Sequence, residues 1–185
     1  MIKNFFGHLR NVIVHKWLVF ILCCKAGIPF RGLGHDLSKF SPTEFWQGVK
    51  YFRDGKRSPI QYAKEDYGYS IAWLHHKGRN KHHPEYWYDP NAPKSLPIMP
   101  FCYACEMICD QLAAGKVYQG KNWTKEYQLS YWQMHKDTFM LNENLKQFVT
   151  EVFTQVAGQG IKVTITKKNL RNCYDRSIKF YGEMI

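Results

Sequence analysis

The sequence has no uninterrupted apolar run long enough to cross a membrane as a helix. Its longest run extends from Trp17 to Cys24, whereas a span needs ~20 consecutive apolar residues. Lys16 and Lys25 bracket this run, and no small-residue cleavage site of the kind that ends a secretory signal follows it. We therefore expect a buried helix in a cytoplasmic protein that has no membrane partner.

The sequence also lacks a paired framework of cysteines. It contains six, of which Cys23 and Cys24 are adjacent, and this pattern predicts reduced thiols in a reducing compartment. Cys102 and Cys105 form one CxxC motif, but no second motif is present to complete a zinc site. On a helix these two residues share a face with Cys109, so we interpret the three as part of a buried apolar stripe.

Carboxylates are scarce relative to cations. The chain has 15 Asp and Glu residues against 26 Lys and Arg residues, which gives a formal net charge of +11. Such a surface attracts phosphate-bearing partners, but a solvated surface that only maintains solubility has the same composition. We expect a small anionic, phosphate-bearing substrate. Nucleic acid stays an alternative partner, although no nucleic-acid-binding motif supports it.

Strand patterns are almost absent. Apolar periodicity, caps and chain breakers predict helices at residues 2–26, 41–52, 59–77, 101–118 and 167–181, and one or two more within 124–156. Residues 41–44 (Ser-Pro-Thr-Glu) fit a capping box. Five prolines break residues 78–100 into a long loop rich in histidine and aromatic residues. The sequence thus predicts one all-α domain over residues 1–185, with at most a short β segment near 161–166.

Histidine is concentrated in two short stretches. Five of the eight histidines lie either at position 35, next to Asp36, or between residues 75 and 83. Glu106 and Asp110 are one turn apart in a predicted helix and point the same way, while His15 lies on the predicted inner face of the first helix. Imidazole and carboxylate groups together are ligands of Mn, Fe, Co, Ni and Zn. The combination predicts a divalent-metal site.

Each of these elements alone has a more ordinary explanation. A lone histidine on an apolar helix face, such as His8 or His15, is more often a core or surface residue than a ligand. His135 has polar neighbours that are typical of a surface. Two His-His pairs within nine residues are much rarer by chance. All the elements together in one small domain favour a metal site over coincidence.

The order of these residues resembles the pattern of the HD-domain superfamily of metal-dependent phosphohydrolases. That pattern has a helix-borne histidine, a His-Asp pair and a later aspartate, which His15, His35-Asp36 and Asp110 match. The stretch HDLSK, residues 35–39, resembles the His-Asp-x-Gly-Lys motif of the HD-GYP branch, and His75-His76 resembles its paired histidines. No Gly-Tyr-Pro motif follows. The resemblance implies a compact helical domain of the HD type.

More closely, the sequence is similar to a family of bacterial and phage proteins of unknown function. Three segments carry this likeness: HDLSKFSPTEF at residues 35–45, AWLHHKGRNKHH at 72–83 and EMICD at 106–110. The likeness covers about residues 8–135 and names no substrate. Residues 136–185 are expected to form C-terminal helices and indicate no function.

The resemblance to HD proteins implies hydrolysis of a phosphoester, such as a nucleotide, and it suggests roles for individual residues. One or two divalent ions (Mn, Fe, Co, Ni or Zn) would be held by His15, His35, Asp36, His76, His83 and Asp110. The predicted catalytic residues are Lys39, which would lie near the phosphate, and His75, His82 and Glu106 as general acids or bases. The predicted substrate-binding residues are Arg79, Asn80 and Lys81.

Two other functions stay open at this point. Some HD proteins use a His- and Asp-rich di-iron site as oxygenases, and the histidines beyond a minimal ligand set make that chemistry an alternative here. A metal-stabilised helical module that binds nucleic acid or a protein partner without turnover is a further alternative. Bound iron with oxygen consumption would identify the former, and salt-dependent binding without turnover would identify the latter.

Overall fold

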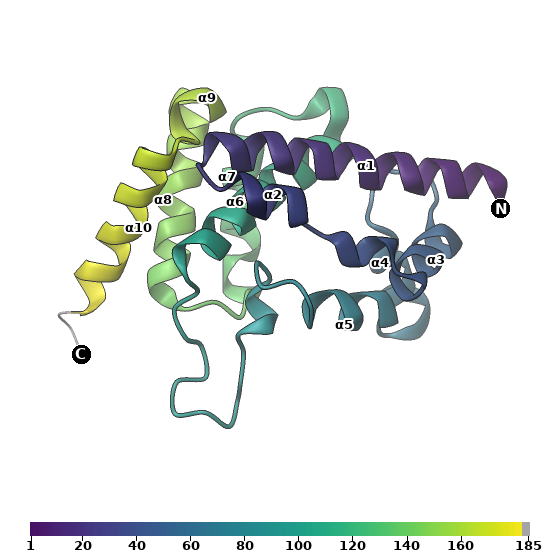
Figure 1. Cartoon of the computed structure of the whole chain (residues 1–185), viewed down its shortest axis with the longest axis horizontal. Helices are drawn as coiled ribbons and strands as arrows, with labels where there is room; N and C mark the ends of the chain where they lie inside the picture. Colours follow the sequence, from purple (N-terminus) through teal and green to yellow (C-terminus); the bar gives the residue numbers. More distant parts are fainter. Residues whose placement is uncertain (183–185) are drawn as a thin grey trace.

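The computed structural model describes residues 1–182, and this part of the chain is helical and contains no strand, as Figure 1 shows. The α-helices are α1 (Ile2–Lys25), α2 (Pro29–Gly34), α3 (Pro42–Tyr51), α4 (Pro59–Tyr67), α5 (Ile71–Lys77), α6 (Phe101–Gln119), α7 (Tyr127–His135), α8 (Glu143–Gln159), α9 (Ile161–Thr164) and α10 (Lys167–Gly182). Short 3-10 helices are η1 (Leu37–Phe40), η2 (Pro84–Tyr86), η3 (Gly120–Asn122) and η4 (Lys136–Thr138). The prediction of an all-α, single compact domain is confirmed.

The helices gather toward the two ends of α1. At one end, α1 packs on α6, and α8 packs against both α7 and α10 (Figure 1). The main hydrophobic core lies there and includes the fully buried side chains of Leu112, Trp132, Phe148 and Phe153. At the other end, α3 packs on α4 and α5 around a smaller cluster. Polar side chains from both ends meet between these two apolar regions.

The predicted helix at residues 59–77 is wrong in one respect, because the chain forms two helices there. Helix α4 ends at Gly68, whose φ of +78° is left-handed and suits a residue without a Cβ. Ser70 then caps α5 by accepting a hydrogen bond from the Trp73 amide at 3.1 Å. Gln47 of α3 secures this junction, since its Oε1 accepts hydrogen bonds from the Ser70 hydroxyl and the Ala72 amide.

Replacing Ser70 by alanine is expected to lower the free energy of unfolding by about 1–2 kcal/mol, because a buried helix cap is lost. Urea denaturation followed by circular dichroism would measure the change. Ser130→Ala is the matched control, since Ser130 is exposed within α7 and its replacement should change stability little. Equal effects of the two substitutions would show that the cap at Ser70 contributes nothing.

The sequence allowed at most a short β segment near residues 161–166, and no strand forms there. Residues 161–164 form α9, a single helical turn that follows Gly160, whose φ is +84°. Thr164 and Ile165 are buried and Ile161 packs against the main core. Ile161, Thr164 and Ile165 are spaced by three and four residues, so a helical turn places all three on its inner side. The alternation of apolar and polar residues that suggested a strand covers only six positions, and the helical spacing outweighs it.

The cysteines of α6 lie on the apolar stripe that the sequence predicted. All six are free thiols. Cys105 and Cys109 are fully buried on α6, next to the main core, and Cys102 is partly buried. Burial raises the pKa of the Cys105 thiol, so it is a poor nucleophile and packs as a small hydrophobe.

Helix α1 differs from the other described helices in its surface. Among residues 1–182 it is the one helix that is long and apolar enough to cross a membrane, judged by length and composition alone. Its inner face packs on the core through Val12, Val19 and Leu22, as the sequence periodicity predicted. Only 22% of the residues in its most apolar window are buried, however, and Ile2, Phe6, Ile13 and Trp17 of this helix are exposed.

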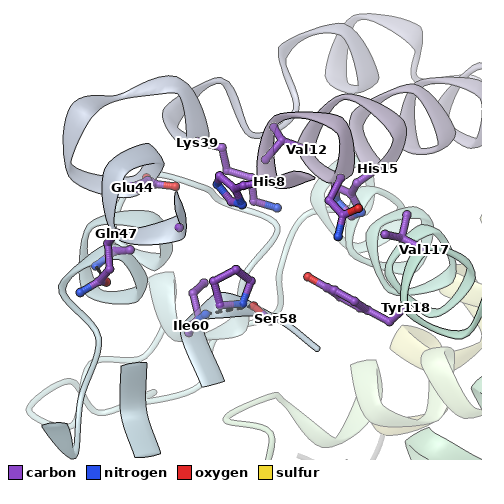
Figure 2. Close-up of a pocket in the computed structure, with 14 residues that line it drawn as sticks. His8, Val12, His15, Lys39, Glu44, Gln47, Ser58, Ile60, Val117 and Tyr118 are labelled. Atoms are coloured by element: carbon purple, nitrogen blue, oxygen red, sulfur yellow. Dashed lines mark hydrogen bonds between the residues drawn. The ribbon is translucent and has the colours of Figure 1, made fainter. Parts of the chain in front are cut away.

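A cavity of about 80 Å³ separates α1 and α6 from α3 and α4, as Figure 2 shows. His8, Val12 and His15 of α1 line one side, and Tyr118 of α6 points its ring and hydroxyl into the space. Lys39 reaches it from η1. The cavity therefore joins solvent-accessible space to the polar residues between the two ends of the molecule.

Candidate metal centre

The His-Asp pair lies at a sharp bend between α2 and η1. Helix α2 ends at Gly34, His35 leaves it with extended ψ, and Asp36 adopts a left-handed φ of +52°. Asp36 is the one non-glycine residue with positive φ among the described residues. Aspartate tolerates this conformation better than most residues, although it still costs energy. The bend brings His35 Nε2 to 3.2 Å from Asp36 Oδ2, with both side chains buried.

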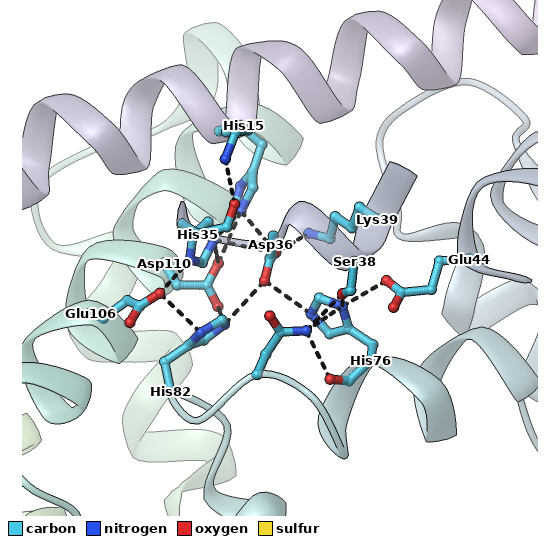
Figure 3. A network of polar contacts seen from close by, with 12 residues as sticks. His15, His35, Asp36, Ser38, Lys39, Glu44, His76, His82, Glu106 and Asp110 are labelled. Atoms are coloured by element: carbon cyan, nitrogen blue, oxygen red, sulfur yellow. Dashed lines mark hydrogen bonds and ion pairs between the residues drawn. The ribbon is translucent and has the colours of Figure 1, made fainter. Parts of the chain in front are cut away.

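Three side chains converge on one side of Asp36 and form a set of four with it. Asp110 Oδ1 lies 3.0 Å from His15 Nε2 and 3.6 Å from His35 Nε2, and the two histidine nitrogens are 3.4 Å apart. Figure 3 shows that the four come from α1, the α2–η1 bend and α6. One ion with bonds of ~2.0–2.2 Å places its ligand atoms roughly 3–4 Å apart. His15, His35, Asp36 and Asp110 therefore form a set that could hold one metal ion.

A second set meets the opposite oxygen of the same carboxylate. His76 Nε2 and His82 Nε2 lie 3.3 and 3.4 Å from Asp36 Oδ1. His83 belongs to the same set, with its ring centroid 4.2 Å from that of His82. Asp36 thus offers one oxygen to each set, which is the arrangement of a carboxylate shared by two ions. The two His-His pairs contribute His76, His82 and His83 to the ligand cluster, while His75 points elsewhere.

Glu106 lies behind the histidine rings. Its Oε1 contacts the Nδ1 atoms of His35 at 3.0 Å and of His82 at 3.3 Å, which directs the Nε2 atoms of both rings toward Asp36 and Asp110. Arg31 holds the other oxygen of Glu106 at 2.6 Å. Carboxylates in this position orient metal-binding histidines and increase their basicity. The sequence suggested acid–base catalysis for Glu106, but this geometry fits a positioning residue better.

Glu44 has the same relation to the other pair of histidines. Its two oxygens contact His75 Nδ1 at 2.6 Å and His76 Nδ1 at 2.8 Å. Ser41 does cap α3, as predicted, through the Glu44 amide, but the Glu44 side chain turns to the histidines. The predicted capping box directs the Glu44 carboxylate back to the Ser41 amide, but that amide donates to the Ser38 carbonyl at 2.9 Å instead. This half of the prediction is wrong, and the role of Glu44 beside the histidines was missed.

The substrate-binding residues predicted in the loop lie away from the two cavities that adjoin the site. Asn80 donates hydrogen bonds to Ser38 Oγ and to the His76 carbonyl, each at 2.8 Å, so it braces the scaffold. Arg79 and Lys81 are exposed, and Lys81 lies over the ring of Tyr86. None of the three lines either cavity.

A second cavity of about 290 Å³ reaches the site at Asp110. It shares Ser58 and Tyr118 with the first cavity, and its lining includes Lys56 and Arg57. These residues carry no motif, which is why the sequence did not indicate them. Asp110 and Tyr118 are two helical turns apart on α6. Residues of other segments, including Lys56 and Arg57, form the other walls of this cavity.

The electrostatics of the cluster favour a bound cation. Burial opposes ionisation of Asp36 and Asp110, but the adjacent His35 ring, together with Lys39 for Asp36 and His15 for Asp110, holds both pKa values well below their usual range. Burial, reinforced by the Lys39 charge, lowers the pKa of His15 to about 4, so its ring is neutral. Burial opposes a charge on His35 as well, but the surrounding carboxylates raise its pKa well above the usual value. Without an ion, a proton on His35 supplies a positive charge that partly neutralises the carboxylates of Asp36, Asp110 and Glu106.

Unsatisfied polar atoms give an independent test of the fit. Among the described residues, both Asp36 oxygens and both ring nitrogens of His82 are buried without a hydrogen bond of good geometry. Lys39 Nζ lies 2.7 Å from Asp36 Oδ2 as an ion pair, which balances charge on one oxygen only. Buried polar atoms without partners cost about 1–3 kcal/mol each. Both Asp36 oxygens and His82 Nε2 belong to the candidate ligand sets, so metal ions bound there would satisfy these three atoms together, while His82 Nδ1 faces Glu106.

Glu44→Gln is expected to weaken metal binding about 10–100-fold at the position served by His76, because the carboxylate that orients its ring is replaced by a weaker acceptor. Calorimetric titration with Mn²⁺ or Zn²⁺ would measure the affinity at each position. Glu143→Gln, an exposed glutamate of α8, is the matched control. An unchanged titration curve for Glu44→Gln would remove Glu44 from the supporting set.

Comparison with known proteins gives a family but no activity. A family of unknown function, DUF5662, matches residues 4–155, a longer stretch than the residues 8–135 expected from the motifs. All the side chains of both candidate ligand sets lie within it. No curated protein and no solved structure matches the chain. The family match lends no support to the HD-domain superfamily, so that part of the predicted resemblance rests on the motif order alone.

Proposed function

The chain belongs to a family of unknown function, DUF5662, and from its buried cluster we propose that it is a metal-dependent phosphohydrolase of the HD-domain type. The observation that carries the proposal is the double set of ligands around Asp36, which is open to two cavities and paired with a lysine. The substrate would be a small phosphoester such as a nucleotide. The six free thiols support a reducing, cytoplasmic compartment.

Two divalent ions are proposed, with Asp36 as their shared ligand. His15, His35 and Asp110 would complete one site, and His76, His82 and His83 the other. The imidazole-rich set favours Mn, Fe, Co, Ni or Zn over Mg or Ca, which prefer oxygen ligands. Such ions, when bound, would polarise a phosphoryl oxygen and acidify water. The chain's part is to hold the ligands in place, through Glu106 behind one pair of rings and Glu44 behind another.

Lys39 is the proposed partner of the phosphoryl group. Its ammonium lies on Asp36 and lines the first cavity, so a phosphate oxygen approaching the ligand cluster would meet it. Burial opposes its charge, but Asp36 and Asp110 outweigh that and hold the pKa of Lys39 above its usual value. A permanent cation at this point would neutralise charge on the phosphoryl oxygens. Lys56 and Arg57 in the second cavity would bind further anionic groups of the substrate.

His75 is the residue best suited to exchange protons with solvent near the site. It is partly exposed, whereas His15, His35, His76 and His82 are buried, and its ring nitrogen contacts Glu44 at 2.6 Å. Glu44 in turn lines the first cavity. A histidine oriented by a carboxylate is a common general acid or base. Tyr118, whose hydroxyl points into the same cavity, is proposed as a substrate contact.

The test is a screen for phosphate release from p-nitrophenyl phosphate, bis(p-nitrophenyl) phosphate and a set of nucleotides, with each candidate metal added to metal-free protein. We expect metal-dependent turnover that Asp36→Asn abolishes and that the exposed substitution Lys50→Met leaves unchanged. Stoichiometric bound metal without turnover of any phosphoester would contradict the hydrolase. Salt-dependent nucleic-acid binding in that case would favour a metal-stabilised binding module.

A di-iron oxygenase is a second candidate, favoured by one observation. Four histidines in addition to His15 lie in the two ligand sets, more than a hydrolytic site requires. Nitrogen-rich sites suit iron as well as the other metals. Two iron atoms per chain in protein purified without added metal, together with oxygen consumption in a substrate screen, would select this chemistry over hydrolysis.

A further inference from the structure

The first 35 residues carry charge of one sign only. They contain five cations, at Lys3, Arg10, Lys16, Lys25 and Arg31, and no aspartate or glutamate. The first carboxylate of the chain is Asp36, which is buried in the metal centre. Lys3, Arg10 and Lys25 are exposed. Helix α1 and the segment after it therefore present positive charge without any neighbouring negative charge in sequence.

The same helix exposes a stripe of large apolar side chains. Ile2, Phe6, Ile13 and Trp17 are all exposed, with 62% of Phe6 and 60% of Trp17 accessible. Their spacing of four, seven and four residues places them along one side of the helix, away from the buried inner face. Arg10 lies in the same stripe, between Phe6 and Ile13. Its long side chain can lie along apolar surface while its guanidinium reaches polar surroundings.

Helix α2, which packs on α1, and η1 expose further apolar side chains. Phe30, Leu33 and Leu37 are exposed, and Phe30 is 87% accessible. Figure 1 shows α2 lying alongside α1, and Lys16 Nζ of α1 donates hydrogen bonds to the carbonyls of Leu33 and His35. Seven exposed apolar residues of α1, α2 and η1 are here called the N-terminal face: Ile2, Phe6, Ile13, Trp17, Phe30, Leu33 and Leu37.

We propose that the N-terminal face binds the surface of a lipid bilayer that contains anionic lipids, with α1 lying in the plane of the interface. Aromatic and aliphatic side chains flanked by lysine and arginine are the composition of interfacial helices. The excess of positive charge complements lipid phosphates, and each basic residue near an anionic surface contributes about 1 kcal/mol, or roughly fivefold in affinity. The expectation that the protein has no membrane partner rested on run length, which tests for a span and not for surface binding.

The structure favours surface binding over two other uses of this face. Spanning a bilayer would withdraw α1 from the core. It would also remove His15, a residue of this helix, from its contact with Asp110 in the candidate metal centre. A symmetric dimer through the same face would bring the cations of two copies together without carboxylates from either N-terminal segment to neutralise them. A bilayer with anionic headgroups satisfies both the apolar and the charged parts of the face.

The experiment is flotation of the full chain with vesicles of phosphatidylcholine alone and of equal parts phosphatidylcholine and phosphatidylglycerol. We expect at least tenfold stronger binding to the anionic vesicles, weakened by salt and fully released by alkaline carbonate. Phe6→Ser with Trp17→Ser should reduce binding at least tenfold, and Lys3→Glu with Arg10→Glu should do so by a similar factor. Leu74→Ser with Met134→Ser, two exposed apolar residues on α5 and α7, is the matched control and should bind like the wild type.

Circular dichroism and light scattering on the same samples make each outcome decisive. The variants should keep the helix content and melting temperature of the wild type, because the changed side chains are exposed. The proposal is overturned if folded wild-type protein does not float with anionic vesicles, or if the Phe6/Trp17 variant floats equally well. It is also overturned if the wild type is a dimer that this variant dissociates, or if carbonate fails to release bound protein. None of these results bears on metal content or turnover, so the two proposals fail separately.

Discussion

Asp36→Asn is expected to abolish metal binding at both positions of the centre. The carboxylate gives Oδ1 to the set of His76 and His82 and Oδ2 to the set of His15 and His35. Asparagine keeps the shape but removes the charge and one of the two anionic oxygens. Substitutions that only support a metal ligand cost 10–100-fold in affinity, so loss of a shared ligand should exceed about 100-fold at each position.

The measurement is metal content by elemental analysis together with thermal unfolding at several metal concentrations. Ligand binding to the native state adds about 2.7 kcal/mol to the free energy of unfolding at a metal concentration 100 times the dissociation constant. Wild-type protein should show this stabilisation, and Asp36→Asn should show almost none at the same concentration. Asp137→Asn, an exposed aspartate of η4, is the matched control. One ion bound with wild-type affinity by Asp36→Asn would mean that the two ligand sets do not share this residue.

Most members of the candidate cluster could be named from sequence because they are rare residue types with a recognisable order, although His82, expected to act in catalysis, lies in the second set. His15, His35, Asp36 and Asp110 meet in space as the motif order implied, and His76 and His83 are near them. The spacing within a His-His pair cannot indicate which ring faces inward, since that depends on where α5 begins. Ser70 and Gln47 decide that start, and only the fold brings those two residues together.

The residues that support the cluster were harder to predict for a different reason. Glu44 lies in a segment that already has a local explanation as a helix start, and its contact with His76 joins residues 32 positions apart. Arg79 and Lys81 are exposed and line neither cavity beside the cluster. Their position beside the histidines suggested a substrate site, but neighbouring residues on a helix end and its loop point in different directions. The helix pattern itself was largely predictable because apolar periodicity is local, and it failed at Gly68, whose positive φ ends α4 inside the helix predicted for residues 59–77.

Lys39→Met is expected to lower the turnover number for phosphoester hydrolysis about 100- to 1,000-fold while leaving metal bound, the range seen when one preorganised group that stabilises a transition state is removed. Lys39 is not a ligand, since an ammonium has no free electron pair at neutral pH. Its removal takes a competing cation away from Asp36 Oδ2, 2.7 Å distant, so metal affinity should be retained or increased. Methionine preserves most of the aliphatic volume of the side chain.

Separate measurements of metal content and of kcat distinguish this role from a structural one. A lysine that only held the η1 bend in place would, when replaced, loosen Asp36 and reduce metal content and activity together. A lysine that acts on the phosphoryl group would reduce kcat and leave metal content intact. Lys50→Met, which removes an exposed lysine of α3, should change neither. If Lys39→Met keeps both its metal and its full activity, the charge on the phosphoryl group must be balanced by the ions alone, and Lys39 then serves only to neutralise Asp36 before they bind.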